Sequence, residues 1–219
     1  MIVLTVFAAA SLTNVFPQVA RQHHYEFGGS NALAAQIRQG APADVFASAN
    51  TALPFQLYDA GLVEKPVVFT RNQLTMIVPR SNPAHIHSVL DLRKPGTKLV
   101  VAAPGVPAGD YTRTVLHNMN ADDVLKNVVS NENDVRDVVA KVALGEADAG
   151  FVYVTDARSV KGKVATIGIR WSAQPIVSYA VAVVRSGKHK AAARVFVKSL
   201  TGRVAQAKLR AAGFLAATR

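Results

Sequence analysis

Two serines lie where a side chain could bind an anion. Ser11 follows an apolar run from Ile2 to Phe7 and three alanines, and Ser30 follows Tyr25-Glu26-Phe27 and Gly28-Gly29. Each serine is expected to be the N-cap of a helix. A helix N-terminus offers free backbone N–H groups and roughly half a positive charge, and a hydroxyl adds a donor. The pattern therefore predicts two anion-binding helix starts, the alternative being that both serines only cap their helices.

A glycine-rich turn in the middle of the chain offers backbone donors. Lys98 to Ala103 predicts a buried strand, and the turn from Pro104 to Tyr111 leads into a helix. No Gly-Lys-Ser/Thr follows, so this turn is not a P-loop for a nucleotide. It brings the N–H groups of Ala108 and Gly109 to a helix start. Further on, the apolar run Ala147 to Tyr153 predicts a strand that ends on a tyrosine hydroxyl.

The elements that must position these groups alternate between strand and helix. Such alternation predicts an α/β fold with mostly parallel sheets, in which ligands bind beyond the carboxyl ends of the strands. The other expected strands are 43–48, 73–79, 127–129, 164–169 and 176–184, and the other expected helices are 51–60, 90–92, 130–144, 188–200 and 204–212, with Gly213 as a C-cap.

Composition narrows the class of protein. The 219 residues allow one large domain or two small ones, and 50% hydrophobic against 18% charged residues excludes a disordered chain. The absence of cysteine excludes disulfides, thiolate metal sites and cysteine nucleophiles. No apolar run reaches the roughly 20 residues of a membrane span. Ile2 to Ala10 lacks a basic n-region, so it is expected to be the first strand rather than a signal segment.

The formal net charge is +11, and most of the arginines are scattered. A nucleic-acid-binding protein would group its cations and interleave them with aromatic residues, so no nucleic-acid partner is expected. The densest group, Arg185 to Arg194, is assigned to a helix start on a solvated basic surface, which could attract an anionic ligand from a distance. The histidines lie in polar segments where metal ligation is not expected.

Five segments together resemble the periplasmic molybdate-binding proteins of ABC importers. The resemblance covers essentially the whole chain and keeps the family's order. The segments are Val6-Phe7-Ala8-Ala9-Ala10-Ser11-Leu12, Gly40-Ala41-Pro42-Ala43-Asp44-Val45-Phe46, Val106-Pro107-Ala108-Gly109, Asp134-Val135-Arg136 and Gly145-Glu146-Ala147-Asp148-Ala149-Gly150-Phe151-Val152-Tyr153.

The resemblance implies a type II periplasmic binding protein fold. Lobe I would hold residues 1–77 and 181–219, and lobe II residues 78–180, joined by crossing strands near Leu74 to Pro79 and Ile176 to Ala182. An oxyanion, molybdate or tungstate, would lie in the cleft and be held through its oxygens, with no cofactor and no directly coordinated metal. The implied ligand-binding residues are Ser11, Ser30, Ala108, Val135 and Tyr153.

The same resemblance implies a monomeric solute-binding protein that delivers its ligand to a membrane permease. Its location would be periplasmic or otherwise extracytoplasmic, with an export signal or lipid anchor outside this sequence. Asp110 and Asp134 lie close to two implied ligand positions, and a carboxylate facing the anion would repel it; we expect both to face elsewhere. Asn31 replaces a small hydroxyl residue often present in the family's second turn.

A site of neutral donors selects among anions. It binds a fully ionised oxyanion but disfavours hydrogenphosphate, because no acceptor receives the remaining proton. Sulfate must be rejected by its smaller size, and tungstate is expected to bind much like molybdate.

Three other functions remain as alternatives: a binding protein for another oxyanion such as sulfate, an oxyanion-sensing domain of a transcription regulator, and an enzyme on the same fold. An enzyme is not expected, because no Ser/His/Asp set or carboxylate pair converges on the predicted cleft. A regulator would need a helix-turn-helix, and neither end of the chain has room for one.

Overall fold

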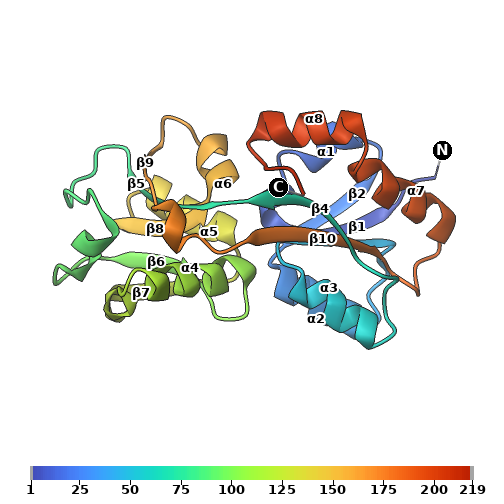
Figure 1. Ribbon diagram of the computed structural model, residues 1–219, viewed down its shortest axis with the longest axis horizontal. Coiled ribbons are helices and arrows are strands. Elements are labelled where there is room, and N and C mark those ends of the chain that lie inside the picture. The colour runs from blue at the N-terminus through green and yellow to red at the C-terminus, as the bar shows by residue number, and fades with distance from the viewer. Residues whose placement is uncertain (1, 218–219) are drawn as a thin grey trace. The chain divides into compact units, whose positions relative to one another are not determined.

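The computed structural model describes residues 2–217, which form two compact units. The first unit comprises the chain up to Asn72 and again from Val177, and the second comprises Gln73–Ile176. Each unit holds a sheet of five strands with helices on both faces (Figure 1). The α/β class predicted from the alternating elements is confirmed.

The sheet of the first unit has the strand order β2-β1-β3-β10-β4. β1 is parallel to β2 and β3, whereas β10 is antiparallel to β3 and β4. Figure 1 shows α2 and α3 on one face and α1, α7 and α8 on the other. The bounds are β1 Thr5–Ala9, β2 His24–Gly28, β3 Val45–Ser48, β4 Val67–Asn72, β10 Val177–Val183, α1 Phe16–Val19, α2 Ser30–Arg38, α3 Ala52–Asp59, α7 Lys190–Leu200 and α8 Arg203–Ala212, with a 3₁₀ helix η1 at Ala10–Leu12.

Both faces of this sheet are covered by apolar side chains, which is why its strands carry few polar residues. On the α2 and α3 face, Phe7 and Phe46 pack with Leu33 and Leu57. On the opposite face Phe16 lies with its ring centroid 5.9 Å from that of Phe69. Helices on both sides thus fix the carboxyl edge of β1, β2 and β3.

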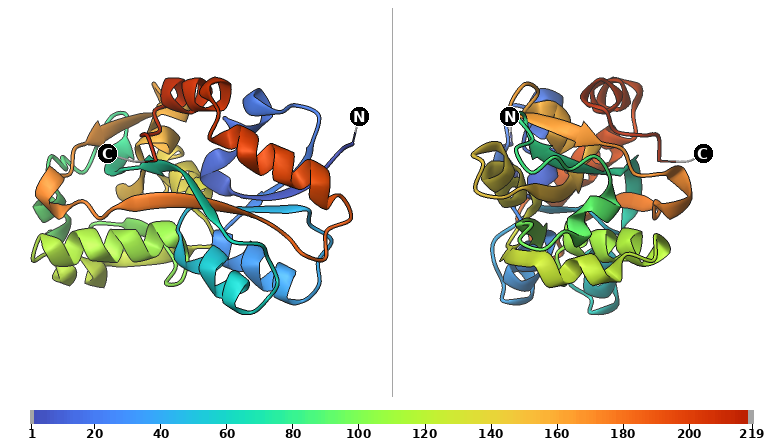
Figure 2. Two further views of the ribbon diagram at one scale, coloured as in Figure 1. Left: turned by 45° about the vertical axis from the view of Figure 1, so that its right-hand side comes forward. Right: turned by 90° about the vertical axis from the view of Figure 1, so that its left-hand side faces the viewer.

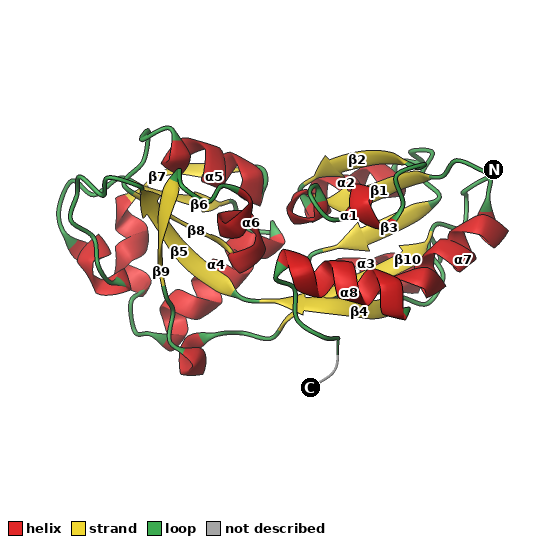
Figure 3. Ribbon diagram, turned by 90° about the horizontal axis from the view of Figure 1, so that it is seen from above, coloured by secondary structure: helices red, strands yellow, loops and turns green. Residues whose placement is uncertain are grey.

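The sheet of the second unit has the order β7-β6-β8-β5-β9. β6 is parallel to β7 and β8, and β5 is antiparallel to β8 and β9. Figure 3 shows the strands of this sheet in yellow with α4, α5 and α6 against it. The bounds are β5 Leu74–Pro79, β6 Leu99–Ala102, β7 Val128–Glu132, β8 Ala149–Tyr153, β9 Val164–Ile167, α4 Pro107–Asn118, α5 Val135–Ala143 and α6 Val154–Ser159, with 3₁₀ helices at Val89–Arg93, Asp122–Asn127 and Trp171–Ala173.

The chain passes between the units at two strand ends. The predicted lobe boundaries, 77/78 and 180/181, fall inside β5 and β10 instead. The reason is pairing: among residues 2–217, the sheet neighbours of β5 are β8 and β9 and those of β10 are β3 and β4, so each strand belongs wholly to one unit. The ends of the predicted first lobe, residues 1 and 218–219, lie outside the described residues.

Two expectations for the first unit were wrong in detail. The first strand begins at Thr5 rather than Ile2, and Ile2 is 52% exposed. The helix expected from Ser11 onward is instead a three-residue 3₁₀ helix followed by the four-residue α1. β4 and α6 had no counterpart in the sequence prediction. Across residues 2–217, no helix has both the length and the apolar character needed to cross a membrane.

Candidate functional site

In the first unit the two predicted serines follow neighbouring strands. β1 and β2 are parallel, with Ala9 paired to Gly28, and each serine comes two residues after its member of that pair. The two turns therefore leave the sheet at the same edge and at the same level. Both serines are buried, with 7% of Ser11 and 2% of Ser30 exposed.

Ser11 is not the N-cap that was predicted. It is the middle residue of η1, whose N-cap is Ala9 without a side-chain bond. Its hydroxyl lies 2.8 Å from the hydroxyl of Tyr179, and either of the two can donate; Asn72 Nδ2 donates to the Tyr179 hydroxyl at 3.4 Å. Sequence analysis missed Tyr179. The available signal was a tyrosine within the apolar run of β10, because a buried tyrosine hydroxyl needs a polar partner.

Ser30 is the first residue of α2, one position later than predicted, because Gly29 is the N-cap. Its Oγ accepts a hydrogen bond from the N–H of Ala49, just after β3, at 3.1 Å. Since the oxygen accepts this bond, the hydroxyl proton remains available to a ligand. The next residue, Asn31, has a buried Oδ1 with no hydrogen-bond partner among residues 2–217.

In the second unit, three predicted residues gather at one sheet edge. β6 lies between β7 and β8 and is parallel to both, so α4, α5 and α6 all begin beyond the same ends of the strands. Ala108 is in the first turn of α4, Val135 is the first residue of α5, and Tyr153 ends β8 and precedes α6. All three residues are buried.

Gly109 allows α4 to begin against the sheet. A Cβ at this position would lie 2.3 Å from the carbonyl oxygens of both Ala102 and Ala103. Real Cβ atoms do not approach a carbonyl so closely, so only glycine fits without moving the backbone. The close packing sets the position of the Ala108 N–H relative to the end of β6.

The two carboxylates near these turns are already engaged. Asp110 is exposed, and its Oδ1 accepts from the N–H of Gly105 at 2.8 Å. Asp134 is the N-cap of α5, and its Oδ1 accepts from Arg136 N–H at 2.7 Å and from Asp137 N–H at 3.3 Å. Each carboxylate therefore stabilises the turn in which it lies.

Helix starts in both units leave backbone donors available. Ser30, Ala108 and Val135 occupy first-turn positions, where an N–H has no acceptor within its own helix. Within the described part of the chain no other group accepts from these three N–H groups. α2, α4 and α5 each have nine residues or more, so each directs a substantial positive dipole end toward its strand edge.

Asp156 is a buried carboxylic acid that sequence analysis missed. It lies in the first turn of α6, is 1% exposed, and accepts from the backbone N–H of Tyr153, while its Oδ2 has no partner among the described residues. Burial raises its pKa to about 7, against a smaller lowering effect of the nearby Arg136. The only sequence signal was an acidic residue directly after a buried strand.

The described residues contain no group of three or more His, Cys, Asp or Glu side chains that could hold a metal ion. The donors at the two edges are hydroxyls and backbone N–H groups, which can hold an anion by hydrogen bonds.

Comparison with known proteins gives consistent matches. Residues 4–215 match the family described as bacterial extracellular solute-binding protein. The molybdate-binding protein ModA of Mycobacterium tuberculosis is 40% identical over 96% of this chain and 84% of its own length, and ModA of Haemophilus influenzae is 35% identical over 97% and 90%. The structure of the Azotobacter vinelandii periplasmic molybdate-binding protein covers 97% of this chain and 98% of its own, with a TM-score of 0.87 at 23% identity, which supports the fold.

Proposed function

The chain belongs to the bacterial extracellular solute-binding proteins, and we propose that it binds molybdate reversibly and delivers it to the membrane permease of an ABC importer. The matches to relatives named molybdate-binding protein cover most of the length of those relatives. The proposal gives the chain a binding role without catalysis, as a monomer outside the cytoplasm.

The observation that carries this proposal is the set of donor groups at two strand edges. In the first unit Ser11 and Ser30 offer hydroxyls, and Ser30 also offers its N–H. In the second unit Ala108 and Val135 offer N–H groups, and Tyr153 is the last residue of β8. We assign both sets to a single oxyanion, which requires the two units to bind it together.

The electrostatics suit a dianion. Three α-helices begin at the proposed site, and each N-terminus is equivalent to roughly half a positive charge. Ser11 contributes less than the sequence suggested, because η1 has only three residues. The hydroxyls add hydrogen bonds to these partial charges, so no lysine or arginine ion pair is required and affinity depends on the geometry of the donors.

Donor-only groups also determine which anions are rejected. A hydrogenphosphate keeps a proton that needs an acceptor, and an unpaired buried O–H costs about 1–3 kcal/mol. Sulfate is fully ionised but smaller, so it cannot reach donors in both units at once. Tungstate is similar to molybdate in size and charge, and we propose that it binds comparably.

Parallel calorimetric titrations with molybdate, tungstate, sulfate and phosphate test this function. We expect molybdate and tungstate to bind at least about a hundredfold more tightly than sulfate, a difference of roughly 2.7 kcal/mol. Sulfate affinity equal to that of molybdate would contradict the assignment and indicate a general oxyanion-binding protein.

A further inference from the structure

The positive charge of this protein is concentrated in one unit. The first unit contains thirteen Lys and Arg against four Asp and Glu, a formal charge of +9, whereas the second contains twelve against ten, a formal charge of +2. The proposed oxyanion site does not explain this difference, since its donors are neutral and come from both units.

Most of the excess lies on two consecutive helices. Between Arg185 and Ala212 there are eight Lys and Arg and no Asp or Glu. α7 and α8 lie end to end on the same face of the first unit's sheet (Figures 2 and 3). The eight cations are Arg185, Lys188, Lys190, Arg194, Lys198, Arg203, Lys208 and Arg210, and all except the partly buried Lys208 are exposed.

Helix periodicity gathers these cations on the outer side. Lys190, Arg194 and Lys198 are four residues apart and form one stripe along α7, opposite the buried Phe196 and Leu200. Arg194 is paired with Glu64 across 2.5 Å. Lys190 also acts on the Glu64 carboxylate, whereas Lys198 takes part in none of the ion pairs found among residues 2–217, so the charge of Lys198 is open to an external anion.

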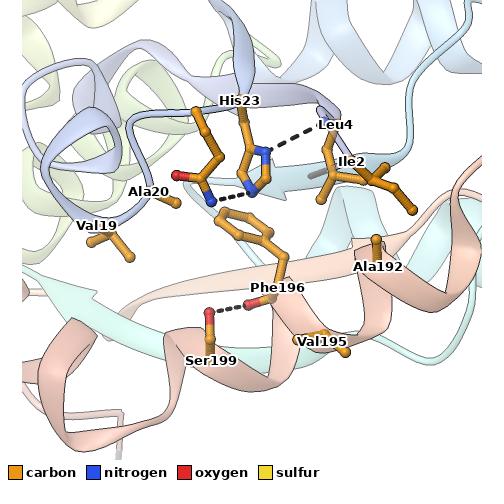
Figure 4. Close-up of a pocket in the computed structure, with 10 residues that line it drawn as sticks. Ile2, Leu4, Val19, Ala20, His23, Ala192, Val195, Phe196 and Ser199 are labelled. Carbon is orange, nitrogen blue, oxygen red and sulfur yellow. Dashed lines mark hydrogen bonds between the residues drawn. The ribbon is translucent and has the colours of Figure 1, made fainter.

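Apolar side chains are exposed beside the cations. Val195 on α7 and Val204 on α8 are 70% and 68% exposed. Val195, but not Val204, lines a groove of about 470 Å³, whose other walls are Ile2 and Leu4, the end of α1 with the segment that follows it, and other residues of α7. Figure 4 shows Ile2 and Leu4 on one side of this groove and Val195 and Phe196 on the other.

Exposed cations around apolar side chains favour a partner whose surface carries negative charge and whose interior, just below that surface, is apolar. Clusters of Lys and Arg on an amphipathic helix bind anionic phospholipid headgroups, and neighbouring apolar side chains reach the acyl boundary. We propose that the α7–α8 face of the first unit, with its adjoining groove, docks on the surface of an anionic phospholipid bilayer. An acidic protein surface could match the charge, but it would leave the exposed valines and the groove without a specific role.

Vesicle sedimentation tests the proposal with the whole chain. Vesicles of phosphatidylcholine alone are compared with vesicles containing one quarter phosphatidylglycerol, at low and high salt. We expect binding only to the anionic vesicles and a loss of binding at high salt, because the attraction is screened within about a Debye length. Equal binding to both kinds of vesicle, or no binding to the anionic ones, would overturn the proposal.

Two variants of equal net charge separate a specific face from overall charge. The first variant combines three substitutions on the α7–α8 face: Lys198→Gln, Arg203→Gln and Arg210→Gln. The second combines three at exposed positions of the second unit: Lys98→Gln, Lys126→Gln and Arg170→Gln. Each cation near an anionic surface contributes about fivefold to affinity, so the first variant is expected to lose about a hundredfold and the second little. Equal losses would show that only net charge matters.

A third variant tests the apolar component. Val195→Ser with Val204→Ser should weaken vesicle binding several-fold at constant salt, while circular dichroism and molybdate titration stay as in the parent protein. If this variant binds anionic vesicles unchanged, the apolar side chains take no part and the bilayer assignment fails in favour of a purely charged partner. The outcome is independent of the oxyanion titrations, so it can fail without affecting the proposed function.

Discussion

In the proposed site, the two units offer their donors in different ways. In the first unit, the donors are side-chain hydroxyls already bonded to the protein, Ser11 to Tyr179 and Ser30 to Ala49. In the second unit, they are largely backbone N–H groups whose positions depend on Gly109 and on the Asp134 cap. A hydroxyl can be removed by a small change of side chain, whereas a backbone N–H is removed only by proline. The first unit's donors are therefore marked by the type of side chain, and the second unit's donors are marked mainly by which residues begin a helix.

Their buried carboxylic acids also differ. In the first unit, hydrogen bonds from Thr5 and His189 outweigh burial and lower the pKa of Asp44. In the second unit, burial dominates and raises the pKa of Asp156 to about 7. The first acid is stabilised as an anion and the second as a neutral group. As the pH changes, these two groups should accordingly contribute to stability in opposite directions.

The largest effect is expected at Gly109. Gly109→Ala places a Cβ against two carbonyl oxygens, so α4 must move away from β6. We expect a loss of about 3 kcal/mol in the free energy of unfolding, together with weaker molybdate binding, because the Ala108 N–H moves with the helix. Urea unfolding and calorimetry measure the two effects.

Gly168→Ala is the matched control in the same unit, since a Cβ there has open space and φ is not in the left-handed region. It should change neither quantity. If Gly109→Ala proves as well tolerated as the control, the close packing of α4 on β6 does not determine the position of the Ala108 N–H.

The pH dependence of stability should reveal the raised pKa of Asp156. Its folded pKa lies above the unfolded value of 3.8, so the native state keeps a proton that the unfolded chain loses between about pH 4 and pH 7. The contribution of this group to the free energy of unfolding is fully present below about pH 4 and is lost as the pH rises to about 7. We expect roughly 2–3 kcal/mol less stability at pH 8 than at pH 5 from this group, measured by urea unfolding.

Asp156→Asn carries no proton that titrates in this range, so its stability should vary less between pH 5 and pH 8. An unchanged slope in the variant would place the titrating group elsewhere. The amide can also keep an oxygen toward the Tyr153 N–H, which limits the loss of local structure.

The serines of the first unit are expected to give the next largest effect. Ser11→Ala and Ser30→Ala each remove a donor to a charged ligand, for a loss of about 1.5 kcal/mol or more, at least tenfold in affinity. Tyr179→Phe removes the protein partner of Ser11 but leaves the Ser11 hydroxyl in place. Calorimetry should show a smaller loss for this variant. If Tyr179→Phe costs as much as Ser11→Ala, the pair acts as one unit and Ser11 is not the sole donor.

The sequence predicted the succession of strands and helices along the chain better than it predicted the local geometry of the site. Three positions were predicted from the local pattern and are found in the structure: Tyr153 at the end of a strand, Ala108 in the first turn of a helix and Gly213 at the end of a helix. β4 was missed because Arg71 and Asn72 interrupt its apolar run, and only pairing with β10 makes it a strand.

The candidate site shows the same limit. Ser30 was taken for an N-cap because nothing in the local sequence shows that Ala49, nineteen residues away, donates to its oxygen. Ser11 was misplaced for a similar reason, since its partner Tyr179 is 168 residues away. Asp156 lies next to a predicted strand, yet its burial depends on neighbouring elements. Contacts between residues far apart in the chain determine these roles, and such contacts cannot be predicted from local patterns in a single sequence.

The smallest effect is expected at Asp134, and it separates capping from charge. Asp134 accepts from two N–H groups of α5, so Asp134→Ala should cost about 1 kcal/mol of stability. Asp134→Asn keeps an oxygen that can accept both bonds but removes a negative charge near the Val135 N–H. Its stability should therefore stay close to that of the parent protein, while molybdate affinity rises slightly, because repulsion of the dianion is relieved. Weaker binding by Asp134→Asn would mean that the carboxylate orients Val135 more than it repels the ligand. The second unit would then resemble the first, with a side chain rather than the backbone controlling its donors.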